Sequence, residues 1–118
     1  DDLDWLHSEE SHGGQGKPVI MSEFGAGALR GYREPHEAKW TEEYQKKVLD
    51  ESLKVYLNHS DISGVAIWQF CDIRVTKENW RGRPRTMNNK GTVDQFRRPK
   101  LVYEAVKKRM KEAGKNQN

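Results

Sequence analysis

The sequence predicts an α/β fold built around a parallel strand, helix, strand unit. Two short runs of apolar and small residues, 18–25 and 62–72, are typical of strands. Between them, residues 41–57 repeat apolar side chains at helical spacing. Two strands joined through a helix in this order form a right-handed crossover with the strands parallel. The 118 residues suffice for one small domain, but a hydrophobic content of 34% is low for a self-sufficient core, so we expect a piece of a larger protein.

The first part of the chain predicts the end of a helix followed by a strand. Residues 3–9 look like the last helical turns, and a glycine-rich stretch at 13–16 connects them to the first apolar run. We expect this run to be one short buried strand with Glu23 at its carboxyl end. The segment that follows, 25–39, is longer than most strand-to-helix connections, which indicates a functional loop.

The central helix is expected to begin near Thr41, because threonine is a good N-cap and the two glutamates after it suit a helix amino terminus. Its apolar stripe, which we expect to pack into the core, consists of Tyr44, Val48, Leu49, Ser52, Leu53, Tyr56 and Leu57. The second strand, 62–72, is nearly continuous in apolar and small residues, as is typical of a strand covered on both faces.

The last part of the chain predicts a long loop and a final helix. Residues 73–98 are polar and irregular, and this length is again typical of a loop with a function. The final helix has Pro99 at an expected N1 position and Gly114 as an expected C-cap. Its apolar stripe consists of Leu101, Val102, Ala105, Val106 and Met110.

Composition excludes several classes of site. The net charge is +3, with basic residues concentrated in the C-terminal third, and no apolar run approaches the roughly 18 residues that a membrane span needs. Cys71 is the one cysteine, so the chain forms neither an internal disulfide nor a multi-thiolate metal site. The sequence contains no metal-ligand constellation, and we expect no metal and no cofactor.

Glu23 is the candidate catalytic residue, because α/β enzymes place their catalytic groups at the carboxyl ends of parallel strands. A carboxylate there can act as nucleophile, base, metal ligand or salt-bridge partner, and position alone favours the salt bridge. Trp68, Gln69 and Asp72 end the second strand at the same rim, where the indole would form an aromatic wall. Core packing is the alternative for Trp68.

A second polar cluster lies in the long loop, where residues 88–91 are Asn-Asn-Lys-Gly. The Asn88 amide and the Lys90 ammonium can converge on one anion if the turn is tight. The alternative is a solvated turn, which an Asn-Asn-Lys-Gly sequence forms readily, and spacing alone favours this alternative.

Four motifs in order resemble the C-terminal part of the β-glucuronidases of glycoside hydrolase family 2. They are Ile20-Met21-Ser22-Glu23-Phe24-Gly25, Trp40-Thr41-Glu42-Glu43-Tyr44-Gln45, Ile67-Trp68-Gln69-Phe70-Cys71-Asp72, and Asn88-Asn89-Lys90-Gly91 followed by Arg98-Pro99-Lys100. The resemblance runs from about residue 17 to residue 110. It implies an incomplete (β/α)8 TIM barrel, in which residues 1–118 are a C-terminal fragment of the catalytic domain. This fragment would hold the last two βα units, preceded by the end of a helix.

The resemblance also implies roles for two residues at the strand ends. Glu23 matches the catalytic nucleophile, with Phe24 in place of the commoner tyrosine. Trp68 matches the tryptophan that lines the sugar subsite, although Gln69 replaces the usual asparagine.

The implied substrate is a β-D-glucuronide. Asn88 and Lys90 match the pair that binds the C6 carboxylate and distinguishes a glucuronide from a glucoside, and Arg85 is a further candidate beside that pair. The implied reaction is retaining hydrolysis, in which one carboxyl group attacks the anomeric carbon and a second protonates the leaving oxygen.

The resemblance further implies that the chain is inactive alone. In the family the acid/base glutamate follows an asparagine at the end of an earlier strand, and no such pair ends a strand in this sequence. Two strands also cannot close a barrel. The chain would therefore need the remainder of the barrel as its partner, in a parent enzyme that the resemblance implies is a homo-oligomer.

Two other functions are compatible with the sequence. Residues 81–85, Arg-Gly-Arg-Pro-Arg, contain the core of an AT-hook, an extended segment whose arginines enter A·T minor grooves. We expect nucleic acid less than a glucuronide as the partner, because a net charge of +3 is far below that of most DNA-binding domains. A non-catalytic interaction fragment is the other alternative, in which a partner would cover the strand edges.

Overall fold

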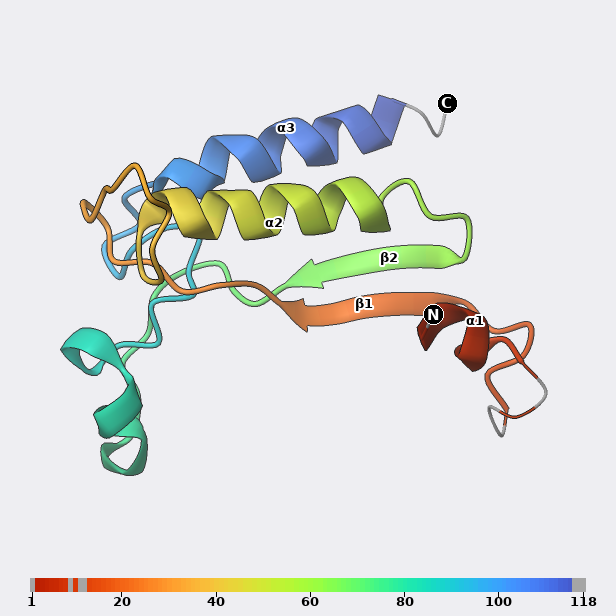
Figure 1. The fold of residues 1–118 in the computed structure, drawn as a ribbon, viewed down its shortest axis with the longest axis horizontal. Helices are drawn as coiled ribbons and strands as arrows, with labels where there is room; N and C mark the ends of the chain where they lie inside the picture. Colours follow the sequence, from red (N-terminus) through yellow and green to blue (C-terminus); the bar gives the residue numbers. More distant parts are fainter. Residues whose placement is uncertain (1, 9, 11–12, 116–118) are drawn as a thin grey trace.

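The computed structural model describes residues 2–8, 10 and 13–115, which form a small α/β unit. In chain order its elements are α1 (Asp2–Leu6), β1 (Val19–Phe24), α2 (Glu42–Tyr56), β2 (Ile62–Ile67), the 3-10 helices η2 (Lys77–Gly82) and η3 (Pro84–Thr86), and α3 (Leu101–Lys115). Strands β1 and β2 pair in parallel, and α2 and α3 lie on one side of the sheet with α2 nearer to it (Figure 1). The predicted parallel strand, helix, strand unit is therefore confirmed.

The two strands are half-exposed rather than buried. Burial alternates between intermediate and exposed along both of them, and Ile20 in β1 is 64% exposed. The prediction of a buried first strand, and of a second strand covered on both faces, is wrong for the described residues. Figure 1 shows the reason: α2 and α3 both lie on one side of the two strands, and only the short α1, near the start of β1, lies on the other.

Helix α2 is confirmed nearly to the residue. The Thr41 hydroxyl accepts a hydrogen bond from the backbone N–H of Tyr44 at 3.1 Å, as an N-cap should. Leu49 and Leu53 of the predicted stripe are fully buried, and the Tyr56 ring meets Phe24 of β1 edge to face, with centroids 5.0 Å apart. This packing fixes the end of β1 that carries Glu23 against the helix.

Strand β2 ends at Ile67, five residues before the predicted end at Asp72. Beyond Trp68, whose N–H still bonds to the Phe24 carbonyl, the backbone changes partner from β1 to the segment 90–93. Gln69 donates its N–H to the carbonyl of Lys90 at 3.1 Å, and Asp72 donates to the carbonyl of Val93 at 3.1 Å. An apolar run that continues in sequence therefore divides between two different partners in space.

The predicted long loop contains two short 3-10 helices that project from the body of the molecule, drawn in turquoise in Figure 1. Arg81 and Gly82 lie in η2, and Pro84 and Arg85 lie in η3. The segment is thus not the extended strand that an AT-hook presents to the minor groove.

The boundaries of the terminal helices differ from the predictions. Helix α1 ends at Leu6, whereas residues 3–9 were expected to be helical; Glu9 lies outside the described residues. Helix α3 begins at Leu101, so Pro99 precedes it and instead forms a β-bridge with Val93. Gly114 lies within α3 rather than capping it. No helix in the described part of the chain is both long and apolar enough to cross a membrane.

Candidate active site

Glu23 lies at the carboxyl end of β1, exposed on the rim of the sheet. Its backbone is left-handed, with φ of 58°, a conformation that non-glycine residues seldom adopt and that clusters at functional sites. The next two residues hold it against β2, because the Phe24 carbonyl accepts from the N–H of Trp68 at 2.9 Å. A side chain at Gly25 would meet the Trp68 carbonyl at 2.5 Å, so only glycine allows this approach.

Trp68 lies at the same rim and is 38% exposed, which makes it a surface residue of this unit rather than part of its core. Because its backbone is bonded to Phe24, it neighbours the strand end that bears Glu23. An exposed indole at the rim of a sheet can stack on a ligand.

Asn88 and Lys90 are built into the structure rather than held in a solvated turn. Asn88 is 8% exposed; its backbone N–H donates to Ile73, and its side-chain Oδ1 accepts from the N–H of Lys90 at 3.0 Å. The carbonyl of Lys90 in turn accepts from Gln69. The structure therefore brings Lys90 beside Gln69, the residue that directly follows Trp68.

A cavity of about 270 Å³ connects the loop after Glu23 with Lys90. Its lining residues are Gly25, Ala26, Gly27, Lys39, Trp40, Tyr44, Gly82, Arg83 and Lys90. Three of them are cationic and none is acidic, and within the described ranges Lys39, Arg83 and Lys90 take part in no ion pair. A cavity with this lining is suited to a ligand that carries an anionic group and an apolar face.

Arg83 lines this cavity, whereas Arg85, the arginine singled out from the sequence, does not. Arg85 is exposed and has a left-handed backbone with φ of 59°. The two arginines are only two residues apart, but Arg83 is extended and precedes η3, whereas Arg85 lies at the kink inside η3. The alternating arginines are visible in the sequence, but the kink, and with it which arginine lines the cavity, could not be predicted from it.

Two buried polar residues of α2 fix the loops around the cavity, and the sequence analysis missed both. Gln45 donates its side-chain amide to the carbonyls of Ala26 and Gly91, each at 3.0 Å. Glu42 accepts from the backbone N–H of Gly31 at 2.9 Å and from that of Leu101 at 2.7 Å. The amphipathic pattern hid them, because polar residues on a helix are normally solvated.

The electrostatics of Glu42 follow from its surroundings. Burial disfavours its charged form, but hydrogen bonds from Arg33, Gly31 and Leu101 outweigh this and hold the pKa of Glu42 below its ordinary value. Glu42, the first residue of α2, is thus a charged structural residue that bonds to the start of α3, and we assign it no chemical role.

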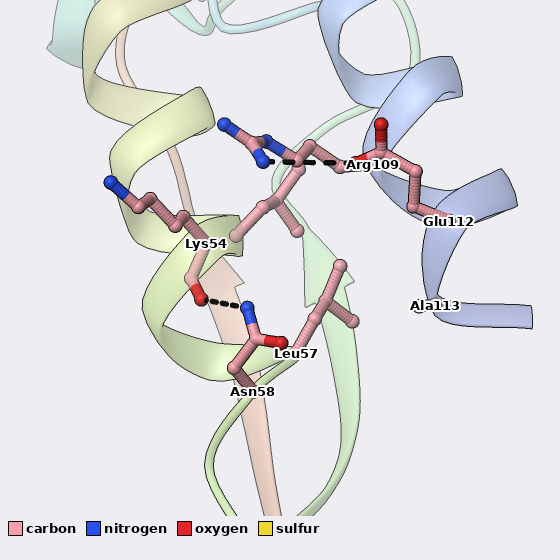
Figure 2. A pocket seen from close by; sticks show the side chains of 7 residues that line it. Lys54, Leu57, Asn58, Arg109, Glu112 and Ala113 are labelled. Atoms are coloured by element: carbon pink, nitrogen blue, oxygen red, sulfur yellow. Dashed lines mark hydrogen bonds and ion pairs between the residues drawn. The ribbon is translucent and has the colours of Figure 1, made fainter. Parts of the chain in front are cut away.

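A second cavity, of about 220 Å³, lies between α2 and α3 near their carboxyl ends (Figure 2). Arg109 borders it and donates two hydrogen bonds to Asp50, at 2.8 and 3.0 Å. Its lining residues all come from α2, the two residues after it and α3, and none comes from the rim that carries Glu23; Arg109 and Glu112 are already ion-paired, so the cavity is not the candidate site. No cluster of three metal-ligating side chains occurs among the residues described.

Comparison with known proteins supplies the context of this site. The family model for glycosyl hydrolases family 2, TIM barrel domain, matches residues 3–114. The β-glucuronidase of Paenibacillus borealis is 35% identical over 100 residues, which cover 84% of this chain and 16% of that protein. The β-glucuronidase of Rattus norvegicus is 33% identical over 100 residues, covering 79% of this chain and 14% of that protein.

Solved structures agree with the sequence relatives. The family 2 β-galacturonidase from Eisenbergiella tayi, bound to galacturonate, is similar with a TM-score of 0.87 and 50% identity, covering 92% of this chain and 19% of that one. The Bifidobacterium dentium β-glucuronidase, complexed with coumarin-3-O-glucuronide, has a TM-score of 0.75 and 25% identity, with 92% and 16% covered. The chain spans less than one fifth of each of these four relatives. It belongs to the TIM barrel domain family of glycosyl hydrolases family 2.

Proposed function

We propose that the full-length protein carrying this chain is a retaining β-glucuronidase, and that residues 1–118 form a C-terminal part of its catalytic barrel. One observation carries the proposal. The loop that holds Asn88 and Lys90 is hydrogen-bonded to Gln69, next to Trp68, and borders a cavity lined by three cations and no acid. An anionic sugar is the ligand that this arrangement suits, and named β-glucuronidases are among the relatives.

In the proposed mechanism Glu23 is the nucleophile. Its carboxylate attacks the anomeric carbon of the bound uronide and forms a covalent glycosyl-enzyme intermediate, while an acid/base carboxyl group protonates the leaving oxygen. Water then hydrolyses the intermediate with the acid/base group acting as base. The two carboxyl groups of a retaining enzyme are about 5 to 5.5 Å apart.

The acid/base group would come from the remainder of the barrel. No Asn-Glu pair ends a strand in this chain, and the described residues form a sheet of two strands, too few to enclose a barrel. The chain therefore contributes the attacking group and the carboxylate contacts, and its partner segments contribute the proton donor.

The substrate class is tested on the full-length protein with matched aryl β-D-glycosides. We expect hydrolysis of the glucuronide at least about 100-fold faster, in kcat/KM, than of the glucoside, because only the uronide offers a carboxylate to Lys90. The 118-residue chain alone serves as the control and should show no turnover. A full-length enzyme that prefers the glucoside would contradict the proposal.

Galacturonide hydrolysis is the second candidate, favoured by the 50% identity to the Eisenbergiella tayi β-galacturonidase. Glucuronide and galacturonide share the C6 carboxylate and differ at C4. The same panel with an aryl β-D-galacturonide decides between them, since the proposed carboxylate contacts serve both sugars.

We further propose Arg83, in addition to Lys90, as a cation of the carboxylate site. Replacing Arg83 by Ala in the full-length enzyme should lower kcat/KM for the uronide about tenfold or more, the cost of a lost hydrogen bond to a charged group. Arg85→Ala is the matched control and should have little effect, because that side chain is exposed and does not line the cavity. The reverse order of effects would return the role to Arg85.

A further inference from the structure

Lys100 is a fully buried lysine in the segment that leads into α3. Its side chain is 0% exposed, and its ammonium makes three short contacts. It donates to the Ala28 carbonyl at 2.7 Å, to Asp72 Oδ1 at 2.8 Å and to the Asn89 carbonyl at 3.0 Å. A lysine ammonium has three donors, so every one of them is used.

The three acceptors belong to the three segments that surround the candidate site. Ala28 lies in the loop that follows β1, Asp72 follows β2, and Asn89 lies between Asn88 and Lys90. The Lys100 ammonium therefore connects three segments: the loop after β1, the residues that follow β2, and the segment 88–91 that is proposed to bind the carboxylate.

Further hydrogen bonds close this network on both sides of Lys90. The Asn89 carbonyl also accepts from the N–H of Ala28 at 2.8 Å, and Asp72 Oδ1 also accepts from the N–H of Gly91 at 2.9 Å. Lys90 therefore lies between Asn89, whose carbonyl bonds directly to Lys100, and Gly91, which is connected to Lys100 through Asp72. A side chain at Gly91 would collide with backbone at Cys71, Asp72 and Val93, so this contact is close-packed.

Such a network is costly to bury. Burial lowers the pKa of Lys100, while the Asp72 carboxylate opposes that shift. Replacing a buried ion pair by apolar residues is often neutral or stabilising, so stability alone is a weak reason for a charge at this place. A defined geometry is the stronger reason, because misplacing a binding group by about 1 Å can cost roughly 100-fold in rate.

We propose that Lys100 is a positioning residue that fixes Asn88 and Lys90 relative to the Glu23 loop and so sets the preference for uronides over neutral sugars. This rests on the proposed function. Without the ammonium, the Asn89 carbonyl and the Asp72 carboxylate lose a shared donor, and the segment 88–91 that they hold is free to shift. A glucoside makes no carboxylate contact, so its turnover depends less on that loop.

The test uses the full-length enzyme and the ratio of kcat/KM for aryl glucuronide to that for aryl glucoside. We expect Lys100→Met to lower the ratio about tenfold or more, mainly through a higher KM for the glucuronide. The double variant Lys100→Met with Asp72→Asn avoids a stranded buried charge and should show the same shift with smaller loss of stability. Lys100→Arg keeps the charge but not the ammonium geometry, and should also lower the ratio.

Lys111→Met is the matched control, since Lys111 is exposed on α3. It should leave both the ratio and KM at the parent values. Folded Lys100 variants, judged by a melting temperature close to that of the parent, that keep the parent ratio and KM would overturn the inference. Lys90→Ala separates the two proposals: if it changes the ratio and the Lys100 variants do not, only this inference fails, and if it leaves the ratio unchanged, the proposed function fails and this inference with it.

Discussion

Replacing Glu23 by Gln in the full-length enzyme should reduce kcat for an aryl β-D-glucuronide by at least about 10⁴-fold. The amide keeps the size of the side chain but cannot attack the anomeric carbon, so the covalent step is lost while substrate binding is retained. KM should therefore change far less than kcat. Steady-state kinetics with enough enzyme to detect residual turnover measures both.

Glu51→Gln is the control for this change, because Glu51 is an exposed carboxylate on α2 away from the rim of the sheet. Its activity should equal that of the parent enzyme. An independent measurement is covalent labelling with a 2-fluoro glucuronide followed by mass spectrometry of the peptides. The adduct is expected on Glu23; full activity of the Gln variant, or an adduct on another carboxylate, would remove Glu23 from the mechanism.

Local signals were enough to predict β1 and α2. Thr41 caps the helix by bonding to Tyr44 three residues later, and Leu49 and Leu53 recur within one turn of each other. These features depend on neighbours in the sequence, so the sequence alone contains them. The same holds for the parallel pairing of the two strands, which follows from the helix between them.

Boundaries set by distant partners could not be predicted in this way. Strand β2 stops at Ile67 because Gln69 and Asp72 bond to Lys90 and Val93, more than twenty positions away. The start of α3 is likewise displaced past Pro99, which pairs with Val93. An apolar run or a proline shows its local preference but not which distant segment arrives beside it.

The candidate site likewise contains some features that local sequence predicts and others that depend on distant partners. The motifs put Glu23 and Lys90 at strand ends and loops, and the backbone bonds now connect the two regions through Trp68 and Gln69. The buried cation of Lys100 was not anticipated, because lysine is normally a surface residue. Its burial depends on three carbonyl and carboxylate acceptors that converge only after folding.

Replacing Lys90 by Ala should lower kcat/KM for the aryl glucuronide about 30- to 4,000-fold. This is the range expected for losing one partner of a desolvated charge pair, about 2 to 5 kcal/mol. The aryl glucoside should lose little, since it carries no carboxylate at C6. The glucuronide loss should appear in KM as well as kcat, because the ammonium both binds the sugar and orients it for attack.

Lys54→Ala is the matched control for the Lys90 change, since Lys54 is an exposed lysine beside the separate cavity of Figure 2. It should leave both substrates unaffected. Equal losses on glucuronide and glucoside in the Lys90 variant would show a general disturbance of the site and would rule out carboxylate recognition. A loss confined to the glucuronide would instead show that the segment 88–91 determines sugar specificity, because Lys90 forms no ion pair with any other residue that the structure describes.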